Sequence, residues 1–448
     1  MKNPKNATPS EIVKYLDEYI IGQNGAKKTI ALALRTRYRR IQLPQELQDE
    51  VMPKNILMIG STGVGKTEIA RRLAKIMGFP FVKVEASKYT EVGFVGRDVE
   101  SMVRDLVSFS MNMVREELEE QSIEAIGDYI LEKIVDKLLP KPPKLSPNGS
   151  EEKYKEARQR MMDRVLSGEM DDKKIEIDIK KSSNPFGGED GGGPVEIMKI
   201  QESLSSVFDT LGGKKEKREV TVKEAKNLLK TEATEAILDK EAIKREGLRR
   251  AENEGIIFID EVDKIAVGSG SSSRQDPSKE GVQRDLLPIV EGSTINTKFG
   301  QVKSDHILFI SAGAFHISKP SDLIPELQGR FPLRVELDPL NEETLYKILT
   351  QPKNSLLKQY KALLEVEEVE LDFEDSAIRK IANISQQAND KTEDIGARRL
   401  HTVVEKVLEN ISFEAEKYKG EKVSITEELV EKELDIFTEN EDIAHYIL

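Results

Sequence analysis

The stretch Gly60–Thr67 constrains the fold of this chain more than any other part. It reads GSTGVGKT and matches the phosphate-binding pattern G-x-x-x-x-G-K-[ST]. The run NILMI at Asn55–Ile59 comes directly before it and is typical of a strand buried on both faces of a parallel sheet. A helical apolar period over Thr67–Met77 follows and stops at Gly78. This order of strand, loop and helix predicts an α/β nucleotide-binding domain, and a chance glycine turn is the alternative.

A loop of this kind presents backbone N–H groups and the N-terminus of a helix to phosphate oxygens. Lys66 is expected to contact the β- and γ-phosphates of ATP, and Thr67 is expected to bind Mg²⁺. The strand GIIFID at Gly255–Asp260 ends in acids. Asp260 is expected to hold Mg²⁺ through water, and Glu261 to orient and deprotonate the attacking water. Two ordinary acids at the end of a strand are the alternative, but this pair beside a P-loop favours hydrolysis.

The long separation of Lys66 and Asp260 indicates an insertion. Both residues are expected on neighbouring strands of one domain, so the chain between them must project outward. The segment 116–254 is charge-rich, and its stretch 182–194 (SSNPFGGEDGGGP) predicts a flexible loop. Other expected elements are strands at 81–84, 306–311 and 333–337, and helices at 98–113 and 222–238. Beyond Pro339 we expect helices with one short strand, where Val369, Leu371 and Phe373 alternate, so an α/β domain with an insert precedes a mainly helical domain.

Composition excludes several classes of protein. The 448 residues carry 68 Lys and Arg against 81 Asp and Glu, a net charge of −13, which disfavours nucleic-acid binding. The basic run at 35–40 (RTRYRR) is interpreted as the solvated face of a helix. The absence of cysteine excludes disulfides and thiolate zinc sites, and the 4 histidines lack the spacing of a helical metal pair. No apolar run is long enough for a membrane span or a secretion signal, which predicts a cytoplasmic protein.

A family resemblance emerges from several stretches taken together. In chain order they read YIIGQ (19–23), GSTGVGKTEIARRLAK (60–75), GFVGRDVES (93–101), FIDEVDKI (258–265), EGVQRDLLP (280–288), SDLIPELQGR (321–330) and GARRLH (396–401). They resemble the HslU (ClpY) family of AAA+ unfoldases in the Clp/Hsp100 group. The resemblance covers nearly the whole chain and is weakest in the insert. Many ATPases share the ATP-binding motifs. The stretches GFVGRDVES and SDLIPELQGR lie outside these motifs and are the most specific to the family.

The resemblance implies a fold and an activity. The fold is α/β: an AAA+ P-loop NTPase domain (1–110 and 241–332), an inserted, mainly helical and partly disordered domain (111–240), and a C-terminal, mainly helical α+β domain (333–448). The activity is that of a homohexameric ATPase that unfolds tagged or unfolded proteins. It threads them into a dodecameric HslV-type threonine peptidase, with ATP and Mg²⁺ as cofactors and without nucleic acid or a membrane as partners.

The resemblance also assigns roles to individual residues. Ile21 would contact the adenine, and the phosphates would be wrapped by Gly63, Val64, Gly65, Lys66, Thr67 and Glu68. Arg330 would reach the γ-phosphate in a neighbouring subunit, Glu326 would lie close to that nucleotide, and Arg398 would act as the sensor arginine. A guanidinium suits these roles because it stays charged and stabilises the transferring phosphoryl group. Surface ion pairs are the alternative for both arginines. A polar sensor residue at the end of the strand 306–311 is expected to be Ser311 or a neighbour.

Two further segments are expected to contact other proteins. In the family a Gly-Tyr-Val-Gly loop lines the central pore, and here it reads Gly93, Phe94, Val95 and Gly96. Phe94 keeps the apolar grip and lacks the hydroxyl of tyrosine; a turn with Phe94 in the core is the alternative. The C-terminal Tyr446, Ile447 and Leu448 would insert between peptidase subunits, whereas packing on their own domain is the alternative.

Three other functions remain open at this stage. A ClpX-like unfoldase would serve a different peptidase, but its zinc-binding N-terminal domain needs cysteines. A clamp-loader or helicase would need a basic pore, which the net charge of −13 and Phe94 disfavour. An ATP-gated scaffold without hydrolysis is disfavoured by Glu261.

Overall fold

The computed structural model describes residues 7–51, 54–90, 96–140, 150–180, 215–267 and 277–439. Contacts divide the chain into two compact units, Met1–Met113 with Arg245–Leu448, and Val114–Lys244. The flexible loop expected at 182–194 lies outside the described residues. The division into three domains with the boundaries given above stays a prediction.

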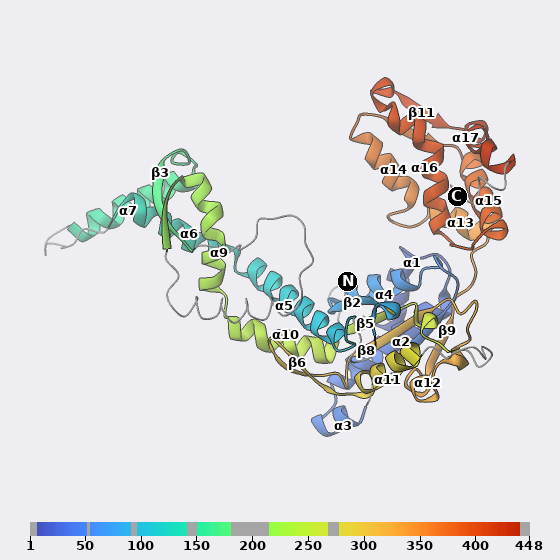
Figure 1. Ribbon diagram of the computed structural model, residues 1–448. Coiled ribbons are helices and arrows are strands. Elements are labelled where there is room, and N and C mark those ends of the chain that lie inside the picture. Colours follow the sequence, from blue (N-terminus) through green and yellow to red (C-terminus); the bar gives the residue numbers. More distant parts are fainter. Residues whose placement is uncertain are drawn as a thin grey trace. The chain divides into compact units, whose positions relative to one another are not determined.

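A five-stranded parallel sheet forms the centre of the first unit (Figure 1). Its strands are, in sheet order, β2 (Phe81–Glu85), β5 (Ile256–Asp260), β8 (Leu308–Gly313), β1 (Ile56–Ile59) and β9 (Leu333–Glu336). The middle strands β5, β8 and β1 are buried along most of their length, which explains their near-continuous apolar sequence. The α/β class is therefore confirmed. The expectation that the strands before Lys66 and Asp260 are neighbours is wrong, because β8 pairs with both β1 and β5 and separates them.

Three amphipathic helices pack with this sheet in one apolar core. They are α1 (Pro9–Asp17), α2 (Asn24–Ile41) and α4 (Lys66–Met77). The start of α1 has a capping box in which the Thr8 side chain accepts from the backbone of Glu11 and the Glu11 carboxylate accepts from the backbone of Thr8. The core includes Ile12, Leu16, Ile30, Leu34, Ile69, Leu73, Ile56, Met58, Phe258 and Ile310. Burial of these faces fixes the sheet and the start of α4, where the P-loop ends.

Shorter elements complete this part of the unit. They are α3 (Gln45–Glu50), α11 (Pro277–Glu291), α12 (Pro325–Arg330), the 3₁₀ turns Ala86–Lys88, Val262–Lys264 and Pro320–Asp322, and the strands β6 (Thr294–Thr297) and β7 (Gly300–Lys303). The antiparallel pair β6–β7 was not predicted from the sequence. Within the described part of the chain, no helix combines the length and the apolar character needed to cross a membrane.

The C-terminal region has its own apolar core, built mainly from helices. Its elements are α13 (Glu342–Thr350), α14 (Leu356–Glu365), β10 (Glu370–Phe373), α15 (Asp375–Lys391), α16 (Arg398–Phe413), the 3₁₀ turn Ala415–Tyr418, β11 (Lys422–Ile425) and α17 (Glu427–Glu439). The predicted strand is β10, and it pairs in parallel with β11. β11 has little strand signal in its sequence, because only Ile425 is buried in a strand of four residues next to charged side chains.

The second unit is a helical body with one hairpin. It contains parts of α5 (Ser101–Gln121) and α10 (Lys240–Glu254), and α6 (Ile123–Leu138), α7 (Ser150–Leu166), α9 (Val222–Ile237), β3 (Lys174–Lys180) and β4 (Lys215–Thr221). β3 and β4 pair antiparallel, and their buried Ile175, Ile177 and Val220 join the helices in a small core. The remaining parts of α5 and α10 belong to the first unit. There the buried Ser110 hydroxyl of α5 donates to the Gly247 carbonyl of α10 at 2.8 Å. The helix predicted at 98–113 begins at Ser101 and continues to Gln121.

The basic run at 35–40 is not a solvated face, because Arg37 and Arg40 are both buried. The Arg37 guanidinium donates to the carbonyl oxygens of Gly255 (3.0 Å), Asn253 (2.9 Å) and His306 (2.7 Å). Carbonyls at the end of a helix and the start of a strand need donors, and Arg37 supplies them where α10 leads into β5. Burial lowers the pKa of Arg37 to about 9, so the side chain carries its charge at neutral pH.

Replacing Arg37 is expected to destabilise the whole first unit. Arg37→Leu keeps an apolar stem but leaves several buried carbonyls without donors, which should lower the free energy of unfolding by about 3 kcal/mol. The matched control is Arg39→Leu, because Arg39 is exposed on the same helix, and its effect should stay within about 0.5 kcal/mol. Chemical denaturation measures both, and equal midpoints would contradict the role given to Arg37.

Candidate nucleotide-binding site

A large cavity lies at the edge of the sheet where β1, β5 and β8 end, and its volume is about 1780 Å³. It is large enough for a nucleotide, since small-molecule sites are typically about 300–1,000 Å³. Most of the predicted site residues line it: Ile21, Gly63, Val64, Gly65, Lys66, Thr67, Glu68, Asp260, Glu261 and Arg398. The sheet brings the P-loop and the acids together although they are far apart in the chain.

Other predicted site residues lie elsewhere. Glu326 and Arg330 are exposed on α12, outside the cavity lining, and Arg330 Nε donates to Glu291 Oε1 at 2.9 Å. Ser311 is buried inside β8 and does not line the cavity, so its position does not support contact with an attacking water. The cavity instead receives His316 and Ser318 from the loop after β8, which the sequence analysis did not single out.

The segments expected to contact other proteins are mostly beyond the described residues. Gly93, Phe94 and Val95 lie outside them, as do Tyr446, Ile447 and Leu448. Gly96 is described and is exposed. Beside it, the residues Tyr89 and Arg97 form an isolated parallel bridge that closes the base of this loop.

The phosphate end of the cavity is the P-loop itself. Gly63 and Gly65 have φ angles of 77° and 104°, which glycine adopts readily and other residues rarely do. Lys66 opens α4, and its ammonium donates to the carbonyl oxygens of Gly60 and of Ser61 (2.8 Å). Burial lowers the pKa of Lys66, and the nearby charge of Asp260 opposes this shift. A buried ammonium beside free N–H groups at a helix start is a site for polyanionic phosphate.

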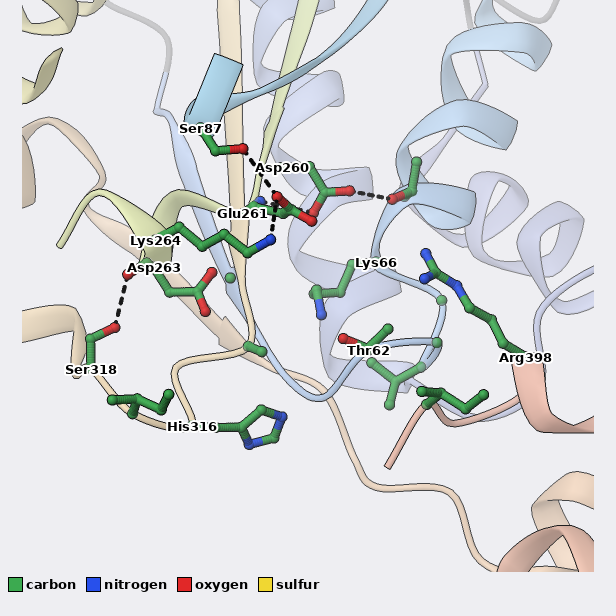
Figure 2. A pocket seen from close by; sticks show the side chains of 18 of the residues that line it. Thr62, Lys66, Ser87, Asp260, Glu261, Asp263, Lys264, His316, Ser318 and Arg398 are labelled. Atoms are coloured by element: carbon green, nitrogen blue, oxygen red, sulfur yellow. Dashed lines mark hydrogen bonds and ion pairs between the residues drawn. The ribbon is translucent and has the colours of Figure 1, made fainter. Parts of the chain in front are cut away.

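The two acids at the end of β5 are held by different partners, as Figure 2 shows. Asp260 accepts from the Thr67 hydroxyl at 3.3 Å and pairs with Lys83 at 2.8 Å. Glu261 accepts from the Ser87 hydroxyl at 3.3 Å and from the Lys264 ammonium at 2.8 Å. Glu261 also has a φ of 57°, an uncommon value for a residue other than glycine. Such backbone strain is frequent at functional sites because the surrounding structure must enforce it.

The donor set at this end suits Mg²⁺ that is shared with phosphates. Thr67 Oγ1 and Asp260 Oδ2 lie 3.3 Å apart at the cavity wall and offer two oxygen ligands. Among the described residues, no group of three or more His, Cys, Asp or Glu side chains forms a cage for a metal. Mg²⁺ is usually held by one or two protein oxygens together with substrate phosphates and water, so these residues fit it.

Another part of the cavity lining, called the apolar slot below, is formed by hydrophobic side chains. Tyr19, Ile20 and Ile21 from the α1–α2 connection face it, and the C-terminal region adds Leu340, Ile348 and Ile395. The sequence analysis found Ile21 alone through the YIIGQ stretch. Branched apolar side chains from these two parts of the chain are suited to contact with a flat base such as adenine. No local pattern distinguishes Ile348 or Ile395 from ordinary core residues, so the sequence offered no signal for them.

Gln23 holds the loop that brings Ile21 to the apolar slot. It is buried at the start of α2 with a φ of 56°. Its side-chain amide donates to the Asp338 carbonyl and accepts from the Asp338 N–H, both at 2.8 Å. Asp338 lies between the last strand of the sheet and the C-terminal helices, so one side chain connects the loop of Ile21 to that linker. The buried Lys27 ammonium of α2 also donates to the Ile20 carbonyl of this loop and pairs with Asp17 at 2.7 Å.

Arg398 reaches the cavity from the start of α16 and extends toward the P-loop in Figure 2. Its charge is one of the smaller influences on the pKa of Lys66, after burial and the carboxylates of Asp260 and Asp263. The cavity therefore combines a phosphate cradle, two acids with different partners, an apolar slot and a cationic arm. Chemically, this set can bind a nucleoside triphosphate and activate water beside its last phosphate.

Comparison with family models supports this reading of the site. Residues 56–176 match the model described as ATPase family associated with various cellular activities (AAA), and residues 179–334 match the model described as AAA domain (Cdc48 subfamily). The first match begins at β1 and the second includes β5, so the two contain the P-loop and the acids.

Curated relatives match along the whole chain. A protein of Campylobacter jejuni subsp. jejuni named ATP-dependent protease ATPase subunit HslU is 60% identical over 446 residues, which cover 99% of this chain and 100% of the relative. A protein of the same name from Helicobacter pylori (strain G27) is 61% identical over 443 residues, with 99% of each chain covered.

Removing the amide of Gln23 is expected to weaken nucleotide binding. Gln23→Met keeps the length of the side chain and loses both hydrogen bonds to Asp338, so the wall of the apolar slot is no longer held. The loss of two hydrogen bonds predicts a KM for ATP about tenfold higher with a smaller change in kcat. The matched control is Gln48→Met, because the Gln48 amide donates to the carbonyls of Ile41 and Leu43 away from the cavity. Equal KM values for the two variants would contradict this role.

Proposed function

This chain belongs to the HslU family of ATPase subunits of ATP-dependent proteases, and we propose that it uses ATP hydrolysis to unfold proteins and thread them into an HslV-type peptidase. The observation that carries the proposal is the single cavity lined by the P-loop, by Asp260 and Glu261, and by Arg398 from the C-terminal region. A site built from both regions allows hydrolysis to change how they are held. Mechanical work needs such a connection between chemistry and movement.

In the proposed hydrolysis, the P-loop N–H groups and Lys66 bind the β- and γ-phosphates. Bound Mg²⁺ would supply positive charge beside these phosphates, with Thr67 and Asp260 as its protein partners. Glu261 orients a water molecule and takes its proton. For this, the Glu261 carboxylate exchanges its hydrogen bonds from Ser87 and Lys264 for one from the water. Arg398 stabilises the charge on the transferring phosphoryl group.

The proposal includes a homohexameric ring in which a neighbouring chain completes each site. Arg330 and Glu326 are exposed and lie outside the cavity of their own chain, as residues that serve a neighbour would. Arg330 would leave Glu291 to contact the γ-phosphate in the adjacent subunit. Ile21 would contact the adenine, and the region 333–448 would act as the moving helical domain.

Substrate and peptidase contacts are assigned to three segments, of which the pore loop and the C-terminal tail lie mostly outside the described residues. Gly93, Phe94, Val95 and Gly96 would form the loop that grips tagged or unfolded substrates in the pore. The inserted region 111–240 would meet substrates on the ring face away from the peptidase. Tyr446, Ile447 and Leu448 would bind between HslV-type subunits, and their apolar burial would contribute several kcal/mol at about 25 cal/mol per Å². We place this assembly in the cytoplasm.

Replacing the proposed base should separate binding from hydrolysis. Glu261→Gln keeps the shape of the side chain but cannot take a proton, so ATP turnover should fall by about two to three orders of magnitude. The dissociation constant of a fluorescent ATP analogue should change by less than about threefold. Lys264→Gln is the control, since it removes a partner of Glu261 and keeps the base. A Glu261→Gln protein with unchanged turnover would exclude Glu261 as the base.

The threading role can be tested with a stable fluorescent protein that carries a disordered tail. With an HslV-type peptidase present, the wild-type chain should extinguish the fluorescence in an ATP-dependent manner. Phe94→Ala should lose most of this unfolding activity, because the apolar contact with the substrate is removed.

Phe94→Tyr is the matched control, because it keeps the ring and should unfold the substrate nearly as well as wild type. ATP turnover is measured in the same samples, so that a general loss of ATPase activity is recognised. If Phe94→Ala unfolds the substrate at the wild-type rate, Phe94 is a structural residue and the pore assignment is wrong.

A further inference from the structure

The P-loop touches the connection between α15 and α16 through two glycines. The Ala397 N–H donates to the Gly63 carbonyl at 3.3 Å. A Cβ atom at Gly63 would lie 2.0 Å from the carbonyl oxygen of Ile395, and one at Gly396 would lie 2.5 Å from the carbonyl oxygen of Thr62. These distances are far below van der Waals contact, so any side chain at either position forces the two backbones apart.

Both glycines also need their backbone conformation. Gly63 has a φ of 77° and Gly396 a φ of 59°. Each is therefore restricted twice, by the left-handed conformation and by the neighbouring backbone. Where two backbones touch directly, no side chain lies between them that could change its rotamer and absorb a movement. A displacement of the P-loop is passed directly to the start of α16.

The half-buried Asn389 and the buried Arg399 hold the connection 392–397 in place behind this contact. Asn389 donates to the Gly396 carbonyl at 3.1 Å and accepts from the Ile395 N–H at 3.4 Å. The buried Arg399 donates to the Asn389 side chain (3.3 Å), the Thr392 hydroxyl (2.7 Å) and the Glu393 carbonyl (2.8 Å). These hydrogen bonds fix the connection to α15 and α16. The Cα of Gly396 still faces the P-loop.

Arg398 lies directly after this contact in the chain. It is the first residue of α16, two positions after Gly396, and its side chain is exposed to the cavity and extends toward the P-loop (Figure 2). The direction of the guanidinium therefore depends on how closely Gly396 approaches Gly63. Arg399 instead donates its hydrogen bonds to the connection, so the adjacent arginines have separate roles.

We propose that Gly396 is a positioning residue, which seats the α15–α16 connection on the P-loop and thereby aims Arg398 at the last phosphate of the bound nucleotide. The proposal rests on the function proposed above for Arg398. It adds that the start of α16 follows the P-loop through a backbone contact, so that phosphate binding and the position of the C-terminal helices are coupled at this point.

The test compares two glycine-to-alanine variants of the full chain. Gly396→Ala adds a methyl group where there is no space. Gly420→Ala, in the same C-terminal region, has a similar φ of 79° and no atom within 4 Å of the added Cβ, so it imposes only the backbone strain. Gly396→Ala should lower kcat for ATP hydrolysis roughly ten- to a hundredfold through misplacement of Arg398. Gly420→Ala should stay within about threefold of wild type.

A double-mutant cycle shows whether the loss acts through Arg398. If Gly396 works by aiming this arginine, Gly396→Ala should cost little further activity once Arg398→Ala is present, and the two effects should be strongly non-additive. A purely structural effect would be additive with Arg398→Ala. Asn389→Asp provides a milder second variant, because it loses the donor to Gly396 and keeps the acceptor for Arg399. Asn389→Asp should lower kcat less and should show the same non-additivity with Arg398→Ala. It therefore tests the proposal even if Gly396→Ala fails to fold.

The outcomes separate this inference from the proposed function. If Arg398→Ala alone leaves kcat unchanged, the role proposed for Arg398 is wrong and the inference falls with it. If Arg398→Ala lowers kcat but Gly396→Ala behaves like Gly420→Ala, the role of Arg398 stands and the positioning role of Gly396 is overturned. Additive losses in the cycle overturn it as well.

Discussion

The site depends on one constraint, the common edge at which the parallel strands β1, β5 and β8 end. Paired residues such as Ile59 with Gly313 and Ile259 with Ser311 set the register of these strands. Since β5 is apolar up to Asp260 at its end, a shift of one residue along the strand would carry an apolar side chain beyond the sheet or draw this carboxylate into the buried part. The register therefore fixes where the chain leaves the sheet. The P-loop, the acids at the end of β5 and the loop after β8 meet there, although Thr67 and Asp260 are 193 positions apart in the chain.

The parts of the fold and the site that depend on short runs of consecutive residues could be predicted from the sequence. The P-loop with its strand and helix, and the acids after the apolar run of β5, were both recognised locally, and the parallel α/β class followed from them. Strand order was beyond this reasoning. An apolar run indicates that a strand is buried, but it does not say which strand lies beside it. This is why β8 was not expected between β1 and β5, although Thr67 still reaches Asp260.

Contacts between distant residues left no recognisable signal. Arg37 belongs to a basic run of ordinary appearance, and only the fold shows that backbone carbonyls of Asn253 and Gly255 surround it. Gln23 meets Asp338 across more than half of the chain, and nothing near either residue predicts the pairing. Each of these side chains satisfies backbone groups that secondary structure leaves unpaired. Such groups become known only when the ends of the elements are placed in space.

The charges in the cavity explain why a metal-bound polyphosphate suits it better than a free anion. Lys66 donates to neutral carbonyls, and a phosphate oxygen would give it stronger, charge-assisted hydrogen bonds. Asp260, Glu261 and Asp263 line the same cavity and would repel a bare polyanion. Lys83 and Lys264 offset part of this charge, yet each is already paired with one of the acids. A bound divalent cation would offset this repulsion, with Asp260 and Thr67 as the residues that would hold it, and Glu261, whose partner is Ser87, would stay available for water.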